Sequence, residues 1–365
     1  MRAQAPIAAV HAAAYTIPTD APESDGTLEW NSTTLVVAHV RAAGRDGLGY
    51  TYADDATAAL IRGKLAEVLS GQDALATNAR WIDMTRAVRN LGRAGIASMA
   101  ISAVDTALWD LKGKLLGASV GDLLGLARAS IAAYGSGGFT SYSPARLSEQ
   151  LSGWASQGFH AVKMKVGRDA AADVRRVAKA REAIGAQVEL FVDANGAYAV
   201  QQALRQAERF AERDVRWFEE PVSSDHLEDL RLLREQRPGG MAIAAGEYGY
   251  DAIYFRRMLG AGAVDVLQAD ATRCGGVTGF MAAAAIAESF GMPLSSHCAP
   301  ALHATLCCAA RNAMNLEWFH DHVRIESLVF EGTPGIRDGR LSPDLSRPGL
   351  GLELRVTDAE RLHAA

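Results

Sequence analysis

The feature that most constrains this chain is the alternation of short apolar runs with helical segments from residue 131 onward. Helical periodicity is clear at residues 173–184, where Val174, Val177 and Ile184 share one face. Alternating strands and helices favour a parallel sheet covered by helices. About eight runs within nearly 190 residues suit a closed (β/α)8-type barrel better than an open sheet. The runs are Ile131–Tyr134, Ala161–Lys165, Val188–Asp193, Val215–Glu219, Ile243–Glu247, Val264–Gln268, Pro293–His297 and Ala313–Glu317.

The residues before this alternation follow a different pattern. Thr33–Val40 is rich in β-branched residues and predicts a strand, and Gly44–Gly49 predicts a turn. Apolar residues in 96–111 fall at helical spacing, before a stop signal at Gly117. We therefore predict an α/β protein with an N-terminal α+β capping domain at 1–125 and a barrel at 126–334. A tail of strand and loop at 335–365 is expected to return to the capping domain.

Composition limits the partners and the compartment. The net charge of −5, from 37 basic and 42 acidic residues, leaves no excess of cations for phosphates, so we expect no nucleic-acid partner. We also expect no membrane partner, because no run of 18 or more apolar residues occurs. The four cysteines form no Cys-x-x-Cys pair, which predicts reduced thiols in a cytoplasmic protein. The Ala-rich segment 3–15 contains His11, which favours an opening β-strand over a signal peptide.

Functional side chains recur at the ends of these runs. They follow one another at intervals of 28, 26, 28, 23, 27 and 20 residues, each about one strand–helix unit. A single charged strand end would be unremarkable, because strands end at the surface. In a barrel, however, the carboxyl ends of the strands together form the active-site face. The sequence therefore predicts one site that contains Lys165, Asp193, Glu219, Glu247, Asp270 (two positions past its run), His297 and Glu317.

Three carboxylates would end consecutive strands: Asp193, Glu219 and Glu247. Converging carboxylates repel one another unless a cation or protons neutralise them. Oxygen ligands without His or Cys favour Mg²⁺ over zinc, so we predict a magnesium site. The alternative is a surface acidic cluster. Asn195, two residues past Asp193, is expected to support that ligand from behind.

Lys163 and Lys165 flank Met164, so strand alternation directs both lysines to one side. Two lysines on the inner face of a buried strand are costly unless they meet charges. We predict that Lys163 binds a carboxylate and that Lys165 is a base, with its pKa lowered by the neighbouring ammonium and the metal. The alternative is a strand end whose lysines reach out to solvent.

Asp270 and His297 would end adjacent strands, where a carboxylate fixes the tautomer of an imidazole. Glu317 is predicted to be a protonated acid that shares its proton with a substrate oxygen; the alternative is a carboxylate at the barrel rim. Around the ring, Lys165 and His297 lie on opposite flanks of the carboxylate strands. That arrangement suits proton abstraction next to a carboxylate. We expect structural roles for the other histidines of this region, His303, His320 and His322.

Taken together, these motifs resemble the enolase superfamily and, within it, the mandelate racemase subgroup. The resemblance covers nearly the whole chain. It implies Mg²⁺ bound by the three carboxylates, Lys165 and His297 as the acid/base pair, Glu317 as an electrophilic acid, and a metal-stabilised enediolate. The motifs that carry it are Lys163-Met164-Lys165, Asp193-Ala194-Asn195, Trp217-Phe218-Glu219-Glu220-Pro221, Gly246-Glu247, Asp270 with Gly275-Gly276, His297 and Glu317.

The resemblance implies an enzyme acting on a small-molecule carboxylate, most simply dehydration of a sugar acid, and a homo-oligomer. A racemase or epimerase of a 2-hydroxy acid, or a sugar-lactone cycloisomerase, would use the same residues. A non-catalytic binding barrel would not need a lysine opposite an Asp–His pair. The polar segment Thr19–Ser32, at the place of the family's capping loop, suits a polyol but could also be an exposed loop. Further candidate substrate contacts are Tyr134–Gly138, Arg89, Arg93 and Arg273.

Overall fold

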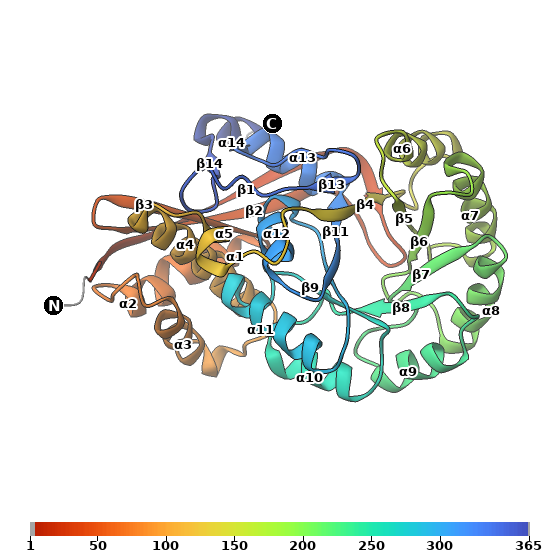
Figure 1. The fold of residues 1–365 in the computed structure, drawn as a ribbon, viewed down its shortest axis with the longest axis horizontal. Helices are drawn as coiled ribbons and strands as arrows, with labels where there is room; N and C mark the ends of the chain where they lie inside the picture. The colour runs from red at the N-terminus through yellow and green to blue at the C-terminus, as the bar shows by residue number, and fades with distance from the viewer. Residues whose placement is uncertain (1–3, 364–365) are drawn as a thin grey trace.

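The computed structural model describes residues 4–363, and the predicted barrel is confirmed in it (Figure 1). Its parallel strands pair in chain order, and the last strand pairs with the first to close the ring. Strand edges differ from the prediction by a few residues, so Glu247 and His297 follow their strands and Glu317 lies within its strand, while Asp270 follows its strand as predicted. The strands are β4 (Ile131–Gly137), β5 (Ala161–Lys165), β6 (Glu189–Asp193), β7 (Val215–Glu219), β8 (Ala242–Ala245), β9 (Val266–Ala269), β10 (Leu294–Ser296) and β11 (Ala313–Phe319).

A helix follows each strand and covers the outside of the ring (Figure 1). Local signals explain the ends of these helices. Asp169 caps α7 by accepting from the backbone N–H groups of Ala171 and Ala172, and Gly185 ends that helix. The helices are α6 (Pro144–Ser156), α7 (Ala170–Ile184), α8 (Val200–Ala211), α9 (Leu227–Gln236), α10 (Ala252–Gly260), α11 (Gly276–Ser289), α12 (Pro300–Ala309) and α13 (His320–Val329).

Strand alternation places a closed apolar layer inside the barrel, below the charged residues. Phe191 and Trp217 stack with their ring centroids 5.0 Å apart, and Tyr134 packs beside both. Two positions further along the same strands lie Asp193 and Glu219. Since inward positions recur every second residue, the strand that supplies an aromatic side chain to the floor also supplies a carboxylate above it.

The cap consists of an antiparallel sheet and helices. Its strands are β1 (Ile7–Ser24), β2 (Glu29–Ala42) and β3 (Arg45–Tyr52). The opening strand predicted from the Ala-rich segment is present, although Ala3 lies outside the described residues. The interpretation of Thr19–Ser32 as a loop was wrong, because β1 and β2 extend through most of it and form a long hairpin.

The turn predicted at Gly44–Gly49 is present but shorter, and the prediction for residues 45–49 was wrong because they belong to a strand. Ala43 and Gly44 alone make the turn, both with positive φ, and β3 starts at Arg45. The glycines of β3 serve another purpose. A Cβ at Gly47 or Gly49 would overlap the backbone of a cap helix. Because glycine has no side chain, that helix can pack closely on the sheet at these two positions.

That helix is α4 (Ile96–Leu116), which includes the predicted helical segment. It is preceded by α1 (Asp55–Leu60), a π-helical turn (Ile61–Leu65), α2 (Ala66–Leu69), α3 (Thr77–Ala87) and a 3-10 turn (Arg89–Leu91), and is followed by α5 (Val120–Leu124). None of the helices between residues 4 and 363 has a stretch long and apolar enough to cross a bilayer.

The tail contacts both parts of the chain. It contains β13 (Arg340–Leu341), β14 (Glu353–Leu354) and a helix that was not predicted, α14 (Val356–His363). β14 pairs with β12 (Phe330–Glu331), which directly follows the last barrel helix. β13 pairs with barrel strand β4, whereas α14 packs beside β1. Leu350 N donates to Asp110 Oδ1 of α4 at 2.7 Å. Residues 1–3 and 364–365 of the predicted domain ranges lie outside the described residues.

Buried hydrogen bonds fix the cap over the ends of the barrel strands. Thr51 Oγ1 of β3 donates to the carbonyl of Thr272 at 2.7 Å, and Tyr50 OH donates to Glu326 Oε1 at 2.7 Å. Ser24 and Thr140 join their hydroxyls at 2.6 Å near the tip of the β1–β2 hairpin. The cap therefore covers the face on which the predicted functional residues lie.

Candidate active site

A cavity of about 430 Å³ lies between the barrel strand ends and the cap. The cap lines it with residues of the β1–β2 hairpin and of β3, among them Trp30, Thr33 and Tyr52. Of the nine residues predicted from the sequence, five line the cavity: Lys165, Asn195, Glu247, Asp270 and His297. The other four are buried: Lys163, Asp193, Glu219 and Glu317. Asp193 contacts Lys165 and Glu317 contacts Cys298, both of which line the cavity, and Lys163 pairs with Asp193, Glu219 and Glu317.

The three predicted metal ligands come together. One carboxylate oxygen from each of Asp193, Glu219 and Glu247 lies within 4.8 Å of the others, and all three residues are buried. Asp193 and Glu219 end β6 and β7, whereas Glu247 follows Gly246, whose φ of 135° is open mainly to glycine. Burial excludes the alternative of a surface acidic cluster. The backbone N–H of Asn195 donates to Asp193 Oδ1 at 2.9 Å, so Asn195 supports this ligand through its main chain.

The electrostatics of these carboxylates fit a bound dication. Burial raises the pKa of Glu219 to about 8, and the charges of Asp193, Glu317 and Glu247 add to this shift although Lys163 opposes it. Such repulsion between buried carboxylates is relieved by a cation among them. The ligand atoms are all oxygens, which suits Mg²⁺. Asp193, Glu219 and Glu247 are therefore the residues that would hold the metal.

Both lysines of β5 are buried among carboxylates, which excludes side chains that reach out to solvent. Lys163 Nζ lies 2.7 Å from both oxygens of Glu219 and 2.8 Å from Glu317 Oε1, and Lys165 Nζ lies 2.5 Å from Asp193 Oδ2. Burial alone would lower their pKa values, but the carboxylates outweigh it and raise both. The ammonium of Lys163 does oppose protonation of Lys165 as predicted, but Asp193 outweighs it and the pKa of Lys165 is raised in the free protein.

His297 and Asp270 form the predicted pair, with Nδ1 and Oδ2 2.8 Å apart. Burial opposes charge on both groups, yet their mutual attraction holds the pKa of Asp270 below its ordinary value. The pKa of His297 is raised, because Glu247 and Asp270 outweigh its burial and the opposing charge of Arg273. The other ring nitrogen, Nε2, lies 3.3 Å from Glu247 Oε2 and 3.2 Å from Cys298 Sγ. Asp270 therefore fixes the imidazole through Nδ1, while Nε2 faces Glu247 and Cys298 at the cavity.

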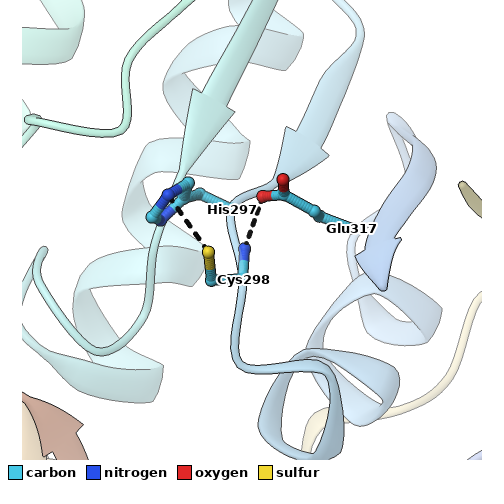
Figure 2. Close-up of side chains that lie close together, drawn as sticks. All are labelled: His297, Cys298 and Glu317. Atoms are coloured by element: carbon cyan, nitrogen blue, oxygen red, sulfur yellow. Dashed lines mark hydrogen bonds between the residues drawn. The ribbon is translucent and has the colours of Figure 1, made fainter. Parts of the chain in front are cut away.

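Glu317 is buried in β11, so the alternative of a rim carboxylate is wrong. Ser136 Oγ donates to its Oε1 at 2.6 Å. Cys298 N donates to its Oε2 at 2.8 Å, as Figure 2 shows. Although burial favours the neutral acid, Lys163, His297 and Lys165 hold the pKa of Glu317 below its ordinary value. The expectation of a protonated acid was therefore wrong for the free protein, because three cationic groups surround this carboxyl.

Sequence reasoning missed the roles of Ser136 and Cys298. The Tyr134–Gly138 motif was noted, but the contact of Ser136 with Glu317 depends on ring closure between β4 and β11. Cys298 directly follows the predicted His297 and lines the cavity, and that adjacency was the available signal.

The remaining candidate arginines and histidines lie in different parts of the fold. Arg273 lines the cavity and lies 3.5 Å from Glu247 Oε1, whereas Arg89 is exposed and Arg93 stacks on Trp81, away from the cavity lining. His303 Nε2 accepts from the backbone of Ala271, as expected of a structural histidine. His322 stacks on Tyr52 with 3.4 Å between ring centroids and also lines the cavity. His320 pairs with Asp20 of the cap at 3.1 Å.

Two family models match the chain and together span most of it. Residues 12–125 match the N-terminal domain of mandelate racemase/muconate lactonizing enzymes. Residues 146–359 match the enolase C-terminal domain-like family.

Curated relatives include cycloisomerases and dehydratases. The chain is 36% identical to 3,6-anhydro-alpha-L-galactonate cycloisomerase of Streptomyces coelicolor over 87% of both chains. It is 32% identical to arabinonate dehydratase of Saccharolobus solfataricus over 82% of both. With D-galactarolactone cycloisomerase of Agrobacterium fabrum it shares 38% identity, over 63% of this chain and 61% of that relative.

Two solved structures have the same architecture over nearly their whole length. A mandelate racemase/muconate lactonizing enzyme-like protein from Rubrobacter xylanophilus has a TM-score of 0.95 and 52% identity, over 97% of this chain and 99% of its own. A racemase from Streptomyces coelicolor, solved with bound magnesium, has a TM-score of 0.92 and 32% identity, over 98% and 99%.

Proposed function

Because this chain belongs to the mandelate racemase/muconate lactonizing enzyme family of the enolase superfamily, we propose that it is a Mg²⁺-dependent enzyme that removes the α-proton of a hydroxylated carboxylate. The specific reaction that we propose is dehydration of a sugar acid. Residues 126–334 would form the catalytic barrel, and residues 1–125 with 335–365 the cap. We also propose a homo-oligomer, which light scattering of the purified protein would test.

One observation carries this proposal: Lys165 and His297 line the same cavity from opposite flanks of the carboxylate cluster. Lys165 ends β5 and His297 follows β10, while β6, β7 and β8 lead to the carboxylates between them. Each group also contacts a carboxylate that orients it, Asp193 for Lys165 and Asp270 for His297. Two proton-transfer groups flanking a cation site suit enolisation of a bound carboxylate.

The buried residues would prepare the site for negative charge. Mg²⁺ held by Asp193, Glu219 and Glu247 would supply positive charge to the substrate carboxylate as it gains enediolate character. Lys163 stays protonated between Glu219 and Glu317 and adds a fixed positive charge beside them. Glu317 is ionised in the free protein, and an approaching substrate carboxylate raises its pKa by like-charge repulsion. Glu317 would thus take up the shared proton when substrate binds.

Proton movements in the proposed dehydration follow from these contacts. Lys165, after losing its proton to solvent, takes the α-proton and leaves the electron pair on the substrate. His297, protonated because of Glu247 and Asp270, gives its Nε2 proton to the departing β-hydroxyl, which leaves as water. The resulting enol becomes the keto acid. If the α-proton lies on the other face of the substrate, His297 acts as the base instead.

The cap side of the cavity favours a polyol with one carboxylate. Its lining includes the hydroxyls of Ser32, Thr33 and Thr34 and the carboxylates of Asp25 and Asp54, and none of the described cap residues that line the cavity is Lys or Arg. A second carboxylate on the substrate would meet like charge there. We therefore propose monocarboxylic sugar acids as substrates in preference to diacids.

Cycloisomerisation is a second candidate, favoured by two curated relatives that are named cycloisomerases and are 38% and 36% identical to this chain. That reaction would use the same α-proton transfer without release of water. A racemase or epimerase would also use both groups, with exchange of the α-proton in either configuration.

The test follows α-proton exchange in deuterated water together with keto-acid formation, across a library of mono- and diacid sugars with Mg²⁺. Dehydration predicts keto acid from wild type and its loss in Lys165→Ala or His297→Asn, by about 10²–10⁴-fold. Exchange or cyclisation without keto acid would favour the other candidates. If neither substitution impairs turnover of a confirmed substrate, the assignment of these residues is wrong.

A further inference from the structure

Three buried side chains at one side of the cavity bring nitrogen, sulfur and oxygen ligand atoms together. One ligand atom from each of His297, Cys298 and Glu317 lies within 4.8 Å of the others. Figure 2 shows the Cys298 thiol pointing at the imidazole, with Sγ 3.2 Å from Nε2. In a tetrahedral zinc site with Zn–S of about 2.3 Å and Zn–N of about 2.0 Å, sulfur and nitrogen ligands lie roughly 3.5 Å apart. The observed pair is close to that separation.

Contacts around this cluster preorganise it for a metal. Asp270 holds His297 Nδ1 at 2.8 Å, which leaves Nε2 as the coordinating nitrogen, as in carboxylate–histidine–zinc arrangements. Cys298 has a φ of 50° and Ala299 a φ of 40°, so the backbone bends sharply here. In this conformation the Cys298 N–H reaches Glu317 Oε2 at 2.8 Å while its side chain returns to the histidine.

A metal ion can reach this cluster, because His297 and Cys298 both line the cavity. Its ligand set differs in kind from the carboxylates of Asp193, Glu219 and Glu247. Hard oxygen ligands suit Mg²⁺, whereas thiolate and imidazole select Zn²⁺, Co²⁺ or Cd²⁺. The cavity therefore offers two neighbouring cation sites, one suited to Mg²⁺ and the other to thiophilic cations such as Zn²⁺.

We propose that His297, Cys298 and Glu317 form an inhibitory site for a thiophilic divalent cation such as Zn²⁺. This site shares no residue with the magnesium ligands but adjoins one of them, because Glu247 Oε2 lies 3.3 Å from His297 Nε2. The ion would form bonds to Nε2, Sγ and a Glu317 oxygen, and both the Nε2 proton of His297 and the thiol proton of Cys298 would pass to solvent. A fourth position stays open for water. An occupied Nε2 can neither accept nor donate a substrate proton, so binding stops turnover. The loss of activity rests on the proposed function, whereas metal binding does not.

Binding is tested with Co²⁺, because its bond to a thiolate gives a charge-transfer absorption band that carboxylate ligands do not produce. The full-length protein is titrated with CoCl₂ in the presence of excess Mg²⁺. Loss of an outer partner of a metal ligand costs about 10–100-fold in affinity, so loss of a ligand should cost at least about 100-fold. We expect the band in wild type, its absence in Cys298→Ala and Cys298→Ser, and its retention in Cys308→Ser, which removes a buried thiol outside this cavity lining.

Inhibition is tested in parallel with ZnCl₂ at saturating Mg²⁺, with each variant's rate expressed relative to its own zinc-free rate. Zinc should inhibit wild type and Cys308→Ser at the same concentration and Cys298→Ala only at about 100-fold more. Circular dichroism establishes that each variant is folded. Equal zinc sensitivity in Cys298→Ala, or no thiolate band in wild type, would overturn the proposal. If no substrate is found, the proposed function fails while the cobalt titration still decides this site.

Discussion

Glu23, near the tip of the β1–β2 hairpin, should make the stability of the protein depend on pH. Its carboxyl is buried, with Oε2 accepting from Trp30 Nε1 at 2.9 Å and Oε1 accepting no hydrogen bond. Burial raises its pKa from 4.5 to about 8, with further raising by Asp321 and Asp20 and opposition from Trp30 and Arg324. Because folding raises this pKa, the folded protein binds the proton more tightly than the unfolded chain does. The resulting stabilisation is complete below pH 4.5, and it is lost as the pH rises toward 8.

The magnitude follows from that shift. At 1.36 kcal/mol per pKa unit, the free energy of unfolding of the wild type falls by at most about 5 kcal/mol as the pH rises, relative to a variant whose side chain at this position stays neutral. Unfolding entropy of about 2.1 cal/mol/K per residue converts this into roughly 6 °C of Tm for a chain of 365 residues. Glu23→Gln keeps the acceptor for Trp30 and stays neutral. It should match wild type near pH 4.5 and exceed its Tm increasingly up to pH 8.

The assay is thermal unfolding by circular dichroism from pH 4.5 to 9 for wild type and Glu23→Gln. Other buried groups titrate in both proteins, so only the difference between the two curves reports on Glu23. Glu29→Gln is the matched control, because Glu29 lies on the same hairpin with 58% of its side chain exposed, and its difference curve should be flat. A flat curve for Glu23→Gln, or one that falls with pH, would refute the reasoning.

Three further predictions concern the site. Chelation of the metal should abolish turnover, and added Mg²⁺ should restore it. Glu219→Gln should weaken Mg²⁺ binding measured by calorimetry. Full activity of the metal-free enzyme would contradict this prediction. Ser136→Ala removes a 2.6 Å hydrogen bond to ionised Glu317, which is worth about 1.5–3 kcal/mol. The substitution should therefore lower kcat about 10–100-fold. An effect confined to KM would instead indicate that Glu317 only binds the substrate. Monocarboxylic sugar acids should have higher kcat/KM than diacids, and Asp54→Asn should narrow that ratio, whereas a preference for diacids would contradict the charge argument.

The ring of strands could be predicted because its signals are local. Connections between parallel strands are long and helical, so apolar runs at a spacing of one strand–helix unit were sufficient to indicate the barrel. The alternation of side chains also predicted that Lys163 and Lys165 face inward together, and both are buried. Residues at equivalent strand ends meet in a closed barrel, so Asp193 and Glu219 could be expected to be neighbours.

The cap was predicted less well, because a glycine can indicate either a turn or a close contact between two backbones. Gly47 and Gly49 were assigned to a turn from their residue type alone. Their purpose is to let α4 approach β3, and such packing between segments about 60 residues apart leaves no local signal. The polar composition of Thr19–Ser32 likewise suggested a loop, although β1 continues to Ser24 and β2 begins at Glu29, with a register shift between Pro18 and Glu23.

The sequence by itself determined which residues reach the carboxyl-terminal face of the barrel, because strand period and spacing are properties of the local chain. Only the tertiary structure decided their charge states. Glu317 was expected to be protonated, but Lys163 from β5 lies 2.8 Å away and favours its ionised form. The tertiary structure likewise brought Ser136 and Cys298 to this carboxyl. A pKa depends on every charge within a few ångströms, and those charges come from strands that meet only when the ring closes.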